Sequence, residues 1–174
     1  MKFLIPFIFI FSTFSLAADI YDFDLKNTKG ETIYLKNFKG KSVLIVNIAT
    51  RCGYTNQLDD LEALYQKYKS KGLVIIAVPS NDFGSQTPEE NEEVVKFCKI
   101  NYGVSFPITT KMSIKGPQQA KLFSFLTQAT GGRDISWNFE KFLVNGKGKI
   151  IGRYSSSTKP LNSTLEKSIK NELF

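Results

Sequence analysis

Two cysteines, Cys52 and Cys98, are the residues of this sequence best suited to covalent chemistry, and the chain contains no histidine. Without imidazole there is no Ser-His-Asp triad, no Cys-His protease dyad and no histidine-ligated metal. Two thiols alone make a poor zinc site, so no metal is expected. The sequence therefore favours thiol chemistry without an imidazole acid or base, with a structural disulfide as the alternative if the protein is exported.

Cys52 lies between a predicted strand and a predicted helix. Residues 43–49 form a β-branched apolar run typical of a strand buried on both faces. Residues 58–68 carry apolar side chains at helical spacing. A thiol before a helix is favoured as thiolate by the partial positive charge of the helix N-terminus, and Arg51 adds a cation if its side chain turns that way. By position alone, Cys52 fits a reactive and a structural role equally well.

The other predicted elements alternate along the chain. Residues 20–38 indicate a hairpin around the turn 27–30, and residues 73–78 indicate a second buried strand. Thr87, Pro88 and Glu90 predict a helix start, with Thr87 as N-cap and the helix continuing to about Asn101.

The last third of the chain completes the pattern. We expect helices over 118–128 and 160–173, and between them two strands, 141–144 and 149–154, joined at Asn145-Gly146-Lys147-Gly148. The order of elements predicts an α/β fold with a mixed sheet flanked by helices and preceded by the hairpin. We find no linker, so residues 18–174 are expected to form a single domain.

The first residues have the layout of a secretory signal peptide. Lys2 is followed by the apolar run Phe3–Phe11, and Ser15-Leu16-Ala17 offers small residues before a cut after Ala17. An uncleaved membrane anchor is the alternative, but the apolar run is short for a membrane span. The sequence predicts removal of residues 1–17 and export, to the periplasm or cell envelope in a bacterium and otherwise by secretion, with no stable membrane anchor.

The charge of the chain is mildly basic. The formal net charge is +7, and removal of residues 1–17 takes away Lys2 and leaves +6. Lysines and arginines are scattered, usually with an acid nearby, and no dense basic run alternates with aromatic residues. This pattern indicates a solvated surface rather than nucleic-acid binding.

Three separated segments resemble, in order, the motifs of glutathione peroxidases. They are Val46–Thr55 around Cys52, Pro79–Gln86, and Trp137–Leu143. The similarity extends from about Ile20 to Leu173. It implies a thioredoxin-like fold and a peroxidase with an antioxidant role in the response to oxidative stress.

The resemblance also implies a catalytic set of four residues: Cys52, Gln86, Trp137 and Asn138. Amide and indole N–H donors can stabilise the thiolate before attack and the developing alkoxide during attack, without a histidine. Each residue taken singly has a simpler explanation. Gln86 would suit a loop, Trp137 a core and Asn138 a turn.

Cys98 resembles the resolving cysteine of the thioredoxin-dependent branch of the family, with a buried helical cysteine as the alternative. Ser80 stands where the second motif often has another cysteine, so Cys98 is the only intramolecular partner for Cys52. Asp82 replaces the usual Gln of that motif. The short stretch between Met112 and Trp137 resembles the monomeric, thioredoxin-using members.

The resemblance implies a cycle that uses no metal, flavin or haem. Cys52 would reduce hydrogen peroxide or organic and lipid hydroperoxides, form a redox-active disulfide with Cys98, and be recycled by a thioredoxin-like protein rather than by glutathione. The alternative is an exported binding or redox-relay protein with a Cys52–Cys98 disulfide and no peroxidase turnover.

Overall fold

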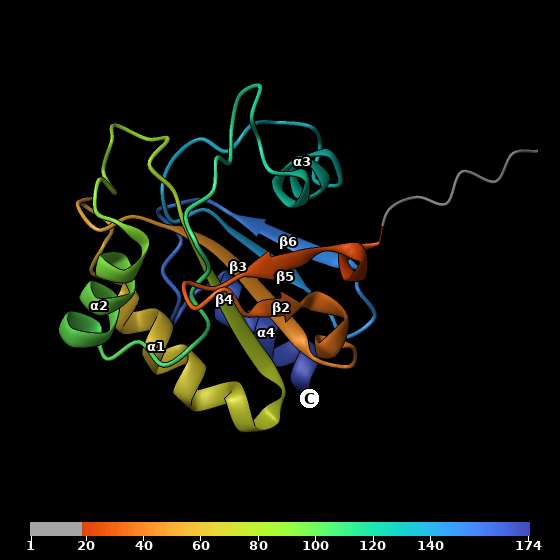
Figure 1. The fold of residues 1–174 in the computed structure, drawn as a ribbon. Coiled ribbons are helices and arrows are strands. Elements are labelled where there is room, and N and C mark those ends of the chain that lie inside the picture. The colour runs from red at the N-terminus through yellow and green to blue at the C-terminus, as the bar shows by residue number, and fades with distance from the viewer. Residues whose placement is uncertain (1–18) are drawn as a thin grey trace, which may run out of the picture.

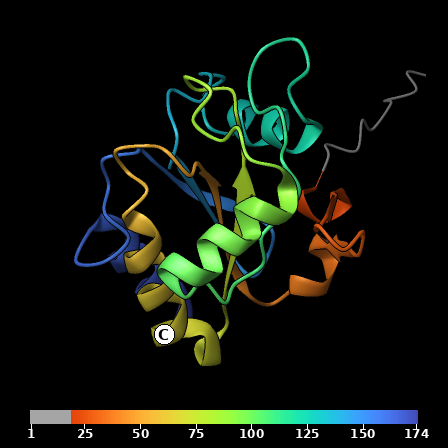
Figure 2. The same ribbon diagram turned by 60° about the vertical axis from the view of Figure 1, so that its left-hand side comes forward.

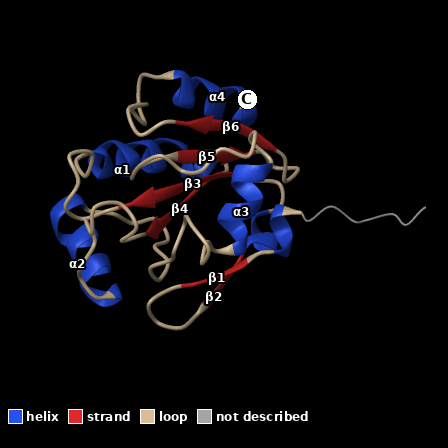
Figure 3. Cartoon of the chain, turned by 90° about the horizontal axis from the view of Figure 1, so that it is seen from above, coloured by secondary structure: helices blue, strands red, loops and turns tan. Residues whose placement is uncertain are grey.

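The computed structural model describes residues 19–174, so the signal peptide predicted for residues 1–17 lies outside the described part. A four-stranded sheet with the order β4-β3-β5-β6 forms its centre (Figures 1 and 3). The strands are β3 (Ser42–Ile48), β4 (Leu73–Pro79), β5 (Lys141–Val144) and β6 (Ile150–Tyr154). β3 runs parallel to β4 and antiparallel to β5, and β5 runs antiparallel to β6. The predicted mixed sheet is confirmed.

Both faces of this sheet are covered, because every residue of β3 and β4 is buried. Leu44, Val46 and Ile48 face a cluster that includes side chains of three helices, α1 (Gln57–Tyr68), α2 (Asn91–Tyr102) and α4 (Thr164–Leu173). Val43 and Ile45 face a second cluster, formed with α3 (Lys121–Gln128) and with the hairpin of β1 (Asp24–Lys26) and β2 (Thr32–Tyr34). The hairpin and α3 lie in front of the sheet in Figure 1, and α4 lies behind it.

The predicted start of α2 is wrong by about one turn. The helix begins at Asn91, with Glu90 as N-cap and the Glu93 carboxylate accepting a hydrogen bond from the Glu90 N–H. The residue predicted as N-cap, Thr87, is fully buried, and its own N–H is bound by Asn81 Oδ1 at 2.8 Å. Residues 87–90 therefore remain non-helical, with a bend at Glu89, before the helix begins. Figure 2 brings α2 forward.

The two later helices also begin after their predicted starts. A turn closed by the Gln119 N–H on the Gly116 carbonyl delays α3 to Lys121. Ser163 caps α4, because its hydroxyl oxygen accepts from the Glu166 N–H, so the segment that begins at Pro160 becomes helical only at Thr164. Within residues 19–174, no helix is long and apolar enough to cross a bilayer.

Three chain segments of the candidate site meet at one end of the sheet. The carboxyl ends of β3 and β4 meet there, with Ile48 opposite Pro79. β5 is antiparallel to β3, and its first residue, Lys141, pairs with Val46 near the same edge. The loops that follow β3 and β4 and the loop that precedes β5 therefore converge, and these loops carry Cys52, Gln86 and Asn138.

Candidate active site

Cys52 lies half-buried in a tight turn between β3 and α1. The turn is closed in both directions, because the Cys52 N–H binds Thr55 Oγ1 at 3.0 Å and the Thr55 N–H binds the Cys52 carbonyl at 3.0 Å. The Thr55 hydroxyl donates in turn to the carbonyl of Ala49, at the end of the strand. These bonds fix the thiol relative to the sheet.

A backbone amide points at the sulfur. The Tyr54 N–H donates to Cys52 Sγ at 3.4 Å. The helix itself begins only at Gln57, so this contact comes from the turn rather than from the first turn of α1. The predicted placement of Cys52 between strand and helix is confirmed.

Gln86 lies against the Cys52 loop through its backbone. Its carbonyl accepts the Arg51 N–H at 2.9 Å and lies 3.2 Å from the Thr50 hydroxyl. Gln86 is reached through a tight turn in which Ser85 has a φ of 52°, a conformation uncommon outside glycine. The structure thus places the predicted Gln86 directly beside the loop that carries the thiol.

The side chains of Gln86 and Asn138 are hydrogen-bonded to each other. Asn138 Nδ2 donates to Gln86 Oε1 at 2.9 Å, although the residues are far apart in sequence. This contact leaves the Gln86 amide group as a donor with no hydrogen-bond partner among residues 19–174. Asn138 Oδ1 is buried and also has no partner there. A buried amide oxygen without a partner costs free energy unless a donor reaches it.

Asn47, which the sequence analysis did not single out, holds the segment that carries Trp137 and Asn138. This fully buried residue of β3 donates from Nδ2 to the Trp137 carbonyl at 3.1 Å and accepts the Glu140 N–H on Oδ1 at 2.9 Å. Its backbone carbonyl accepts the Phe139 N–H at 2.7 Å. These bonds hold Phe139 at a φ of 63°, a strained conformation for a buried aromatic residue. The sequence signals this role of Asn47 only by placing one amide side chain within an otherwise apolar predicted strand.

Trp137 is 38% exposed and packs on Phe83, with the ring centroids 5.7 Å apart. Lys115 Nζ lies 4.5 Å from the centroid of the Phe83 ring. Trp137 is therefore placed at the surface, supported on one side by an aromatic residue of the loop that also carries Gln86. The simpler interpretation of Trp137 as a core residue does not fit this exposure.

Arg51 does not act as a free cation beside Cys52. Its Nε binds Glu89 Oε1 at 2.7 Å, and Thr50 Oγ1 binds Glu89 Oε2 at 2.6 Å. Burial acts to raise the pKa of Glu89, but the hydrogen bonds from Thr50 and Arg51 outweigh it and leave that pKa below its usual value. Glu89 was not recognised from the sequence, which placed it inside the predicted helix start.

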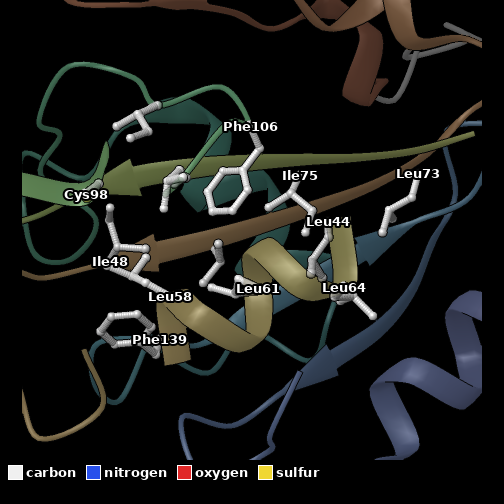
Figure 4. Close-up of a cluster of buried hydrophobic side chains, with 14 of the residues drawn as sticks. Leu44, Ile48, Leu58, Leu61, Leu64, Leu73, Ile75, Cys98, Phe106 and Phe139 are labelled. Atoms are coloured by element: carbon white, nitrogen blue, oxygen red, sulfur yellow. The ribbon is translucent and has the colours of Figure 1, made fainter. Parts of the chain in front are cut away.

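Cys98 is fully buried on α2 and lies in the cluster shown in Figure 4 with Ile48, Leu58 and Phe106. Burial raises the pKa of its thiol to about 12, so the thiol is protonated and unreactive in this conformation. Both cysteines are free thiols, and Cys52 packs against the cluster that contains Cys98. The two sulfurs therefore belong to neighbouring parts of the structure but are not bonded.

The sequence matches known proteins over most of its length. The family model described as "Glutathione peroxidase" matches residues 20–127. The chain is 45% identical to the glutathione peroxidase-like peroxiredoxin HYR1 of Saccharomyces cerevisiae, over 88% of this chain and 98% of that protein. It is 46% identical to the glutathione peroxidase homolog BsaA of Staphylococcus aureus, over 82% of this chain and 92% of that protein.

Solved structures agree in fold. The apo crystal structure of Trgpx superposes with a TM-score of 0.73 at 32% identity, covering 90% of this chain and 96% of that one. A thiol:disulfide interchange protein of the thioredoxin family from Chlorobium tepidum superposes with a TM-score of 0.67 at 16% identity, covering 87% and 93%. The second likeness concerns the fold alone and confirms the predicted thioredoxin-like architecture.

Proposed function

The chain belongs to the glutathione peroxidase family and is thereby a peroxidase, and from this premise we propose a cycle in which Cys52 attacks the peroxide and Cys98 resolves the product. Hydrogen peroxide and organic or lipid hydroperoxides are the proposed substrates. Cys52, Gln86, Trp137 and Asn138 form the proposed catalytic set.

In the first step the Cys52 thiolate attacks one peroxide oxygen. The sulfur supplies an electron pair, an S–O bond forms, and the O–O bond breaks. The departing oxygen takes a proton and leaves as water or an alcohol. The unpartnered donor of Gln86 and the indole N–H of Trp137 suit the stabilisation of this developing oxyanion, because both groups donate without needing to ionise. Asn138 orients Gln86 through the bond between their amides.

In the second step the Cys98 thiol condenses with the Cys52 sulfenic acid, which forms the disulfide and releases water. The buried, protonated Cys98 cannot do this where it lies, because thiolate is the nucleophile and its pKa is raised to about 12. A disulfide also requires the two Cα atoms to lie within roughly 7 Å. We infer that α2 opens locally, which exposes Cys98 and allows it to ionise.

In the third step an external dithiol protein reduces the disulfide by exchange. We propose a thioredoxin-like reductant, with glutathione as the less favoured choice. The yeast relative is named a peroxiredoxin, which supports a thiol-based cycle. Export would place the enzyme outside the cytosol, where such a reductant must itself be kept reduced.

The observation that carries this proposal is the convergence of three loops at one sheet edge. The Gln86 carbonyl binds the Arg51 N–H, one residue before Cys52, and the Gln86 side chain binds Asn138. Residues from three separate motifs are thus joined by direct hydrogen bonds. A purely structural disulfide would require none of these contacts.

Peroxide turnover by the protein without residues 1–17 tests the function. Thioredoxin with its reductase and glutathione with its reductase are run in parallel, and Cys52→Ser is the control. We expect turnover with the thioredoxin system and none from the control. A thiol count before and after mild peroxide adds a second criterion. A permanent disulfide would show no free thiols in either sample and would contradict the cycle.

A further inference from the structure

Glu89 connects the loop that carries Cys52 to the start of α2. It lies two residues before the helix begins, and its two carboxylate oxygens accept hydrogen bonds from consecutive residues of the other loop. Oε2 binds the Thr50 hydroxyl at 2.6 Å, and Oε1 binds Arg51 Nε at 2.7 Å. Those two residues directly precede Cys52, so a single carboxylate fixes the chain that leads into the thiol.

The same chain segment also contacts Gln86. The Arg51 N–H lies 2.9 Å from the Gln86 carbonyl, and the Thr50 hydroxyl lies 3.2 Å from it. A hydroxyl has only one proton to donate, and the nearer, charged oxygen of Glu89 receives it. Glu89 therefore orients Thr50 and Arg51, and the Arg51 N–H binds the Gln86 carbonyl, which sets the position of Gln86 relative to Cys52.

On its other side, the start of α2 is bound to Lys111. Lys111 Nζ donates to the Glu89 carbonyl at 2.6 Å, and the Lys111 N–H donates to Asn91 Oδ1 at 2.7 Å. Opening the helix from this end must break the contacts of Glu89, those of Lys111, or both. The lowered pKa of Glu89 means that its carboxylate stays ionised at neutral pH and keeps its bonds to the Cys52 loop.

Resting on the cycle proposed above, we propose that Glu89 is a positioning residue with two separable effects. It holds Gln86 and Cys52 in the arrangement needed for attack on the peroxide, and it slows the opening of α2 that brings Cys98 to Cys52. Loss of its carboxylate therefore slows the first chemical step and accelerates the second.

An ordinary surface ion pair would not have these effects. The side chain of Arg51 is 65% exposed, and exposed pairs contribute little because solvent screens them. The bond to Thr50 differs, because Thr50 is only 6% exposed and its hydroxyl lies between two segments of the site. The buried contact carries the positioning.

Four substitutions separate the two effects. Glu89→Gln removes the charge and keeps the shape, and Thr50→Val removes the hydroxyl. Lys111→Met removes the side-chain bond to the Glu89 carbonyl, keeps the backbone bond to Asn91, and leaves the Cys52 loop unchanged. Glu92→Gln, on an exposed acid in the first turn of α2, is the matched control.

Two rates are measured for each variant. In a Cys98→Ser background, trapping of the Cys52 sulfenic acid after a hydrogen peroxide pulse gives the rate of the first step. With Cys98 present, acid quenching and mass analysis give the rate of disulfide formation. We expect Glu89→Gln to slow the first step about tenfold, as misplacement of a catalytic group does, and to accelerate the second several-fold. Thr50→Val should slow the first step, Lys111→Met should accelerate only the second, and Glu92→Gln should change neither.

A slower first step together with a faster second step distinguishes positioning from general destabilisation. General destabilisation is monitored by the Lys111→Met variant and by the urea unfolding midpoint of each variant. Equal rates for Glu89→Gln and Glu92→Gln in both steps would overturn the inference, and so would a Glu89→Gln variant that slows both. If the unsubstituted protein forms no sulfenic acid with peroxide, the proposed function itself fails and this inference falls with it. If the unsubstituted protein does form the sulfenic acid and Glu89→Gln has the same rates as Glu92→Gln, only the role proposed for Glu89 is wrong.

Discussion

The amide groups of Gln86 and Asn138 show how single residues can prepare this site for oxyanion chemistry without histidine. Asn138 donates to Gln86 Oε1, and this bond fixes which end of the Gln86 amide carries the free donor. Asn138 Oδ1 stays buried without a partner within residues 19–174. A buried amide oxygen without a hydrogen-bond donor is uncommon in folded proteins, and the O–H of a substrate or of a water molecule would satisfy Asn138 Oδ1.

Loss of either amide should slow the peroxide step without unfolding the protein. For Gln86→Ala we expect single-turnover oxidation of Cys52 to fall about 100-fold, the usual effect of removing one oxyanion donor. For Asn138→Ala we expect a comparable fall, because Gln86 loses the bond that orients it. Cys52→Ser should abolish the reaction. Stopped-flow oxidation with circular dichroism of each variant is the measurement. Full peroxidase activity in Cys52→Ser would refute the assignment.

Asn47 should prove necessary for the placement of Trp137. Asn47→Ala removes bonds to the part-buried Trp137 carbonyl and the buried Glu140 N–H, so we expect a loss of about 2 kcal/mol in the free energy of unfolding. Trp137 is the only tryptophan in the chain, so its fluorescence reports the change directly. We expect a red-shifted emission maximum and slower oxidation of Cys52. Asn171→Ala, at an exposed position of α4, should change neither.

At the residue scale, the motif resemblance indicated Cys52, Gln86, Trp137 and Asn138, and the structure brings their loops together. It did not indicate Asn47 or Glu89. The partners of Glu89 lie nearly forty residues away. The partners of the Glu89 carboxylate depend on how its loop packs on the Cys52 loop, and no local sequence pattern predicts that packing.

At the scale of elements, α2 is anchored at both ends, although the proposed cycle needs it to open locally. Its start is bound to two segments through Glu89 and Lys111, and its end is closed by Gly103 in the left-handed conformation. Its outer face is largely exposed, and Val94 and Cys98 are its buried residues. A helix with few buried side chains has low local stability and can open without global unfolding.

Oxidation should therefore open α2. After peroxide treatment we expect faster hydrogen exchange of residues 89–103, while β3 and β4 stay protected. Cys98→Ser should react once with peroxide, stop at the sulfenic acid and over-oxidise. Equal protection in both states, with the Cys52–Cys98 disulfide confirmed by mass, would rule out the opening step. Normal thioredoxin-coupled turnover by Cys98→Ser would rule out the resolving role.

The order and type of the elements and the start of α1 could be predicted from periodicity, but the starts of α2, α3 and α4 could not. Buried runs and helical spacing identified the strands and α1. Before α2, Thr87 was the predicted N-cap, but the Asn81 side chain binds its N–H and the helix begins only at Asn91. Before α4, Pro160 suggested a start, whereas Ser163 provides the cap. The local sequence indicates where a helix can begin, and tertiary contacts decide where it does begin.

The buried Glu166 joins α4 to α1 and should make the fold sensitive to acid. Its Oε1 accepts from Lys67 Nζ at 2.8 Å and from the Tyr68 hydroxyl at 2.7 Å, and its Oε2 accepts from the Asn162 N–H. The hydrogen bond from Lys67, assisted by the others, outweighs burial and lowers the pKa of Glu166 to about 2. A carboxylate with a depressed native pKa contributes stability above its unfolded pKa, and that contribution is lost as the pH falls toward 2.

Glu166→Gln should therefore flatten the acid branch of the stability profile. We expect the unsubstituted protein to lose about 2 kcal/mol between pH 4.5 and 2 from this group, less than the full shift implies because Lys67 is half exposed. Urea unfolding at stepped pH gives the profile. Glu172→Gln, an exposed acid on the same helix, should keep the original slope. A Glu166→Gln profile with that same slope would contradict this account.

At the scale of the whole molecule, the segment just after the proposed cleavage site is tied to the sheet. Asp19 caps a short 3-10 turn, and its N–H binds the Asp22 carboxylate at 2.9 Å. Tyr21 then anchors the segment, because its hydroxyl donates to the carbonyl of Gly146 in the turn between β5 and β6. Within residues 19–174, these contacts tie the N-terminal segment to the sheet, and removal of residues 1–17 leaves the residues that make them in place.

Export with cleavage after Ala17 is therefore expected to leave the enzyme intact. In a bacterial host, mass analysis of the protein recovered from the envelope should show Ala18 as the first residue. Ala17→Leu, which places a bulky residue at the cleavage position, should leave the precursor uncut, because the peptidase requires a small side chain there. A protein produced without residues 1–17 should show the same unfolding midpoint and the same single-turnover oxidation of Cys52 as the exported form. Recovery of the active protein with Met1 intact in the cytosol would contradict export, and it would give cytosolic thioredoxin direct access to the Cys52–Cys98 disulfide.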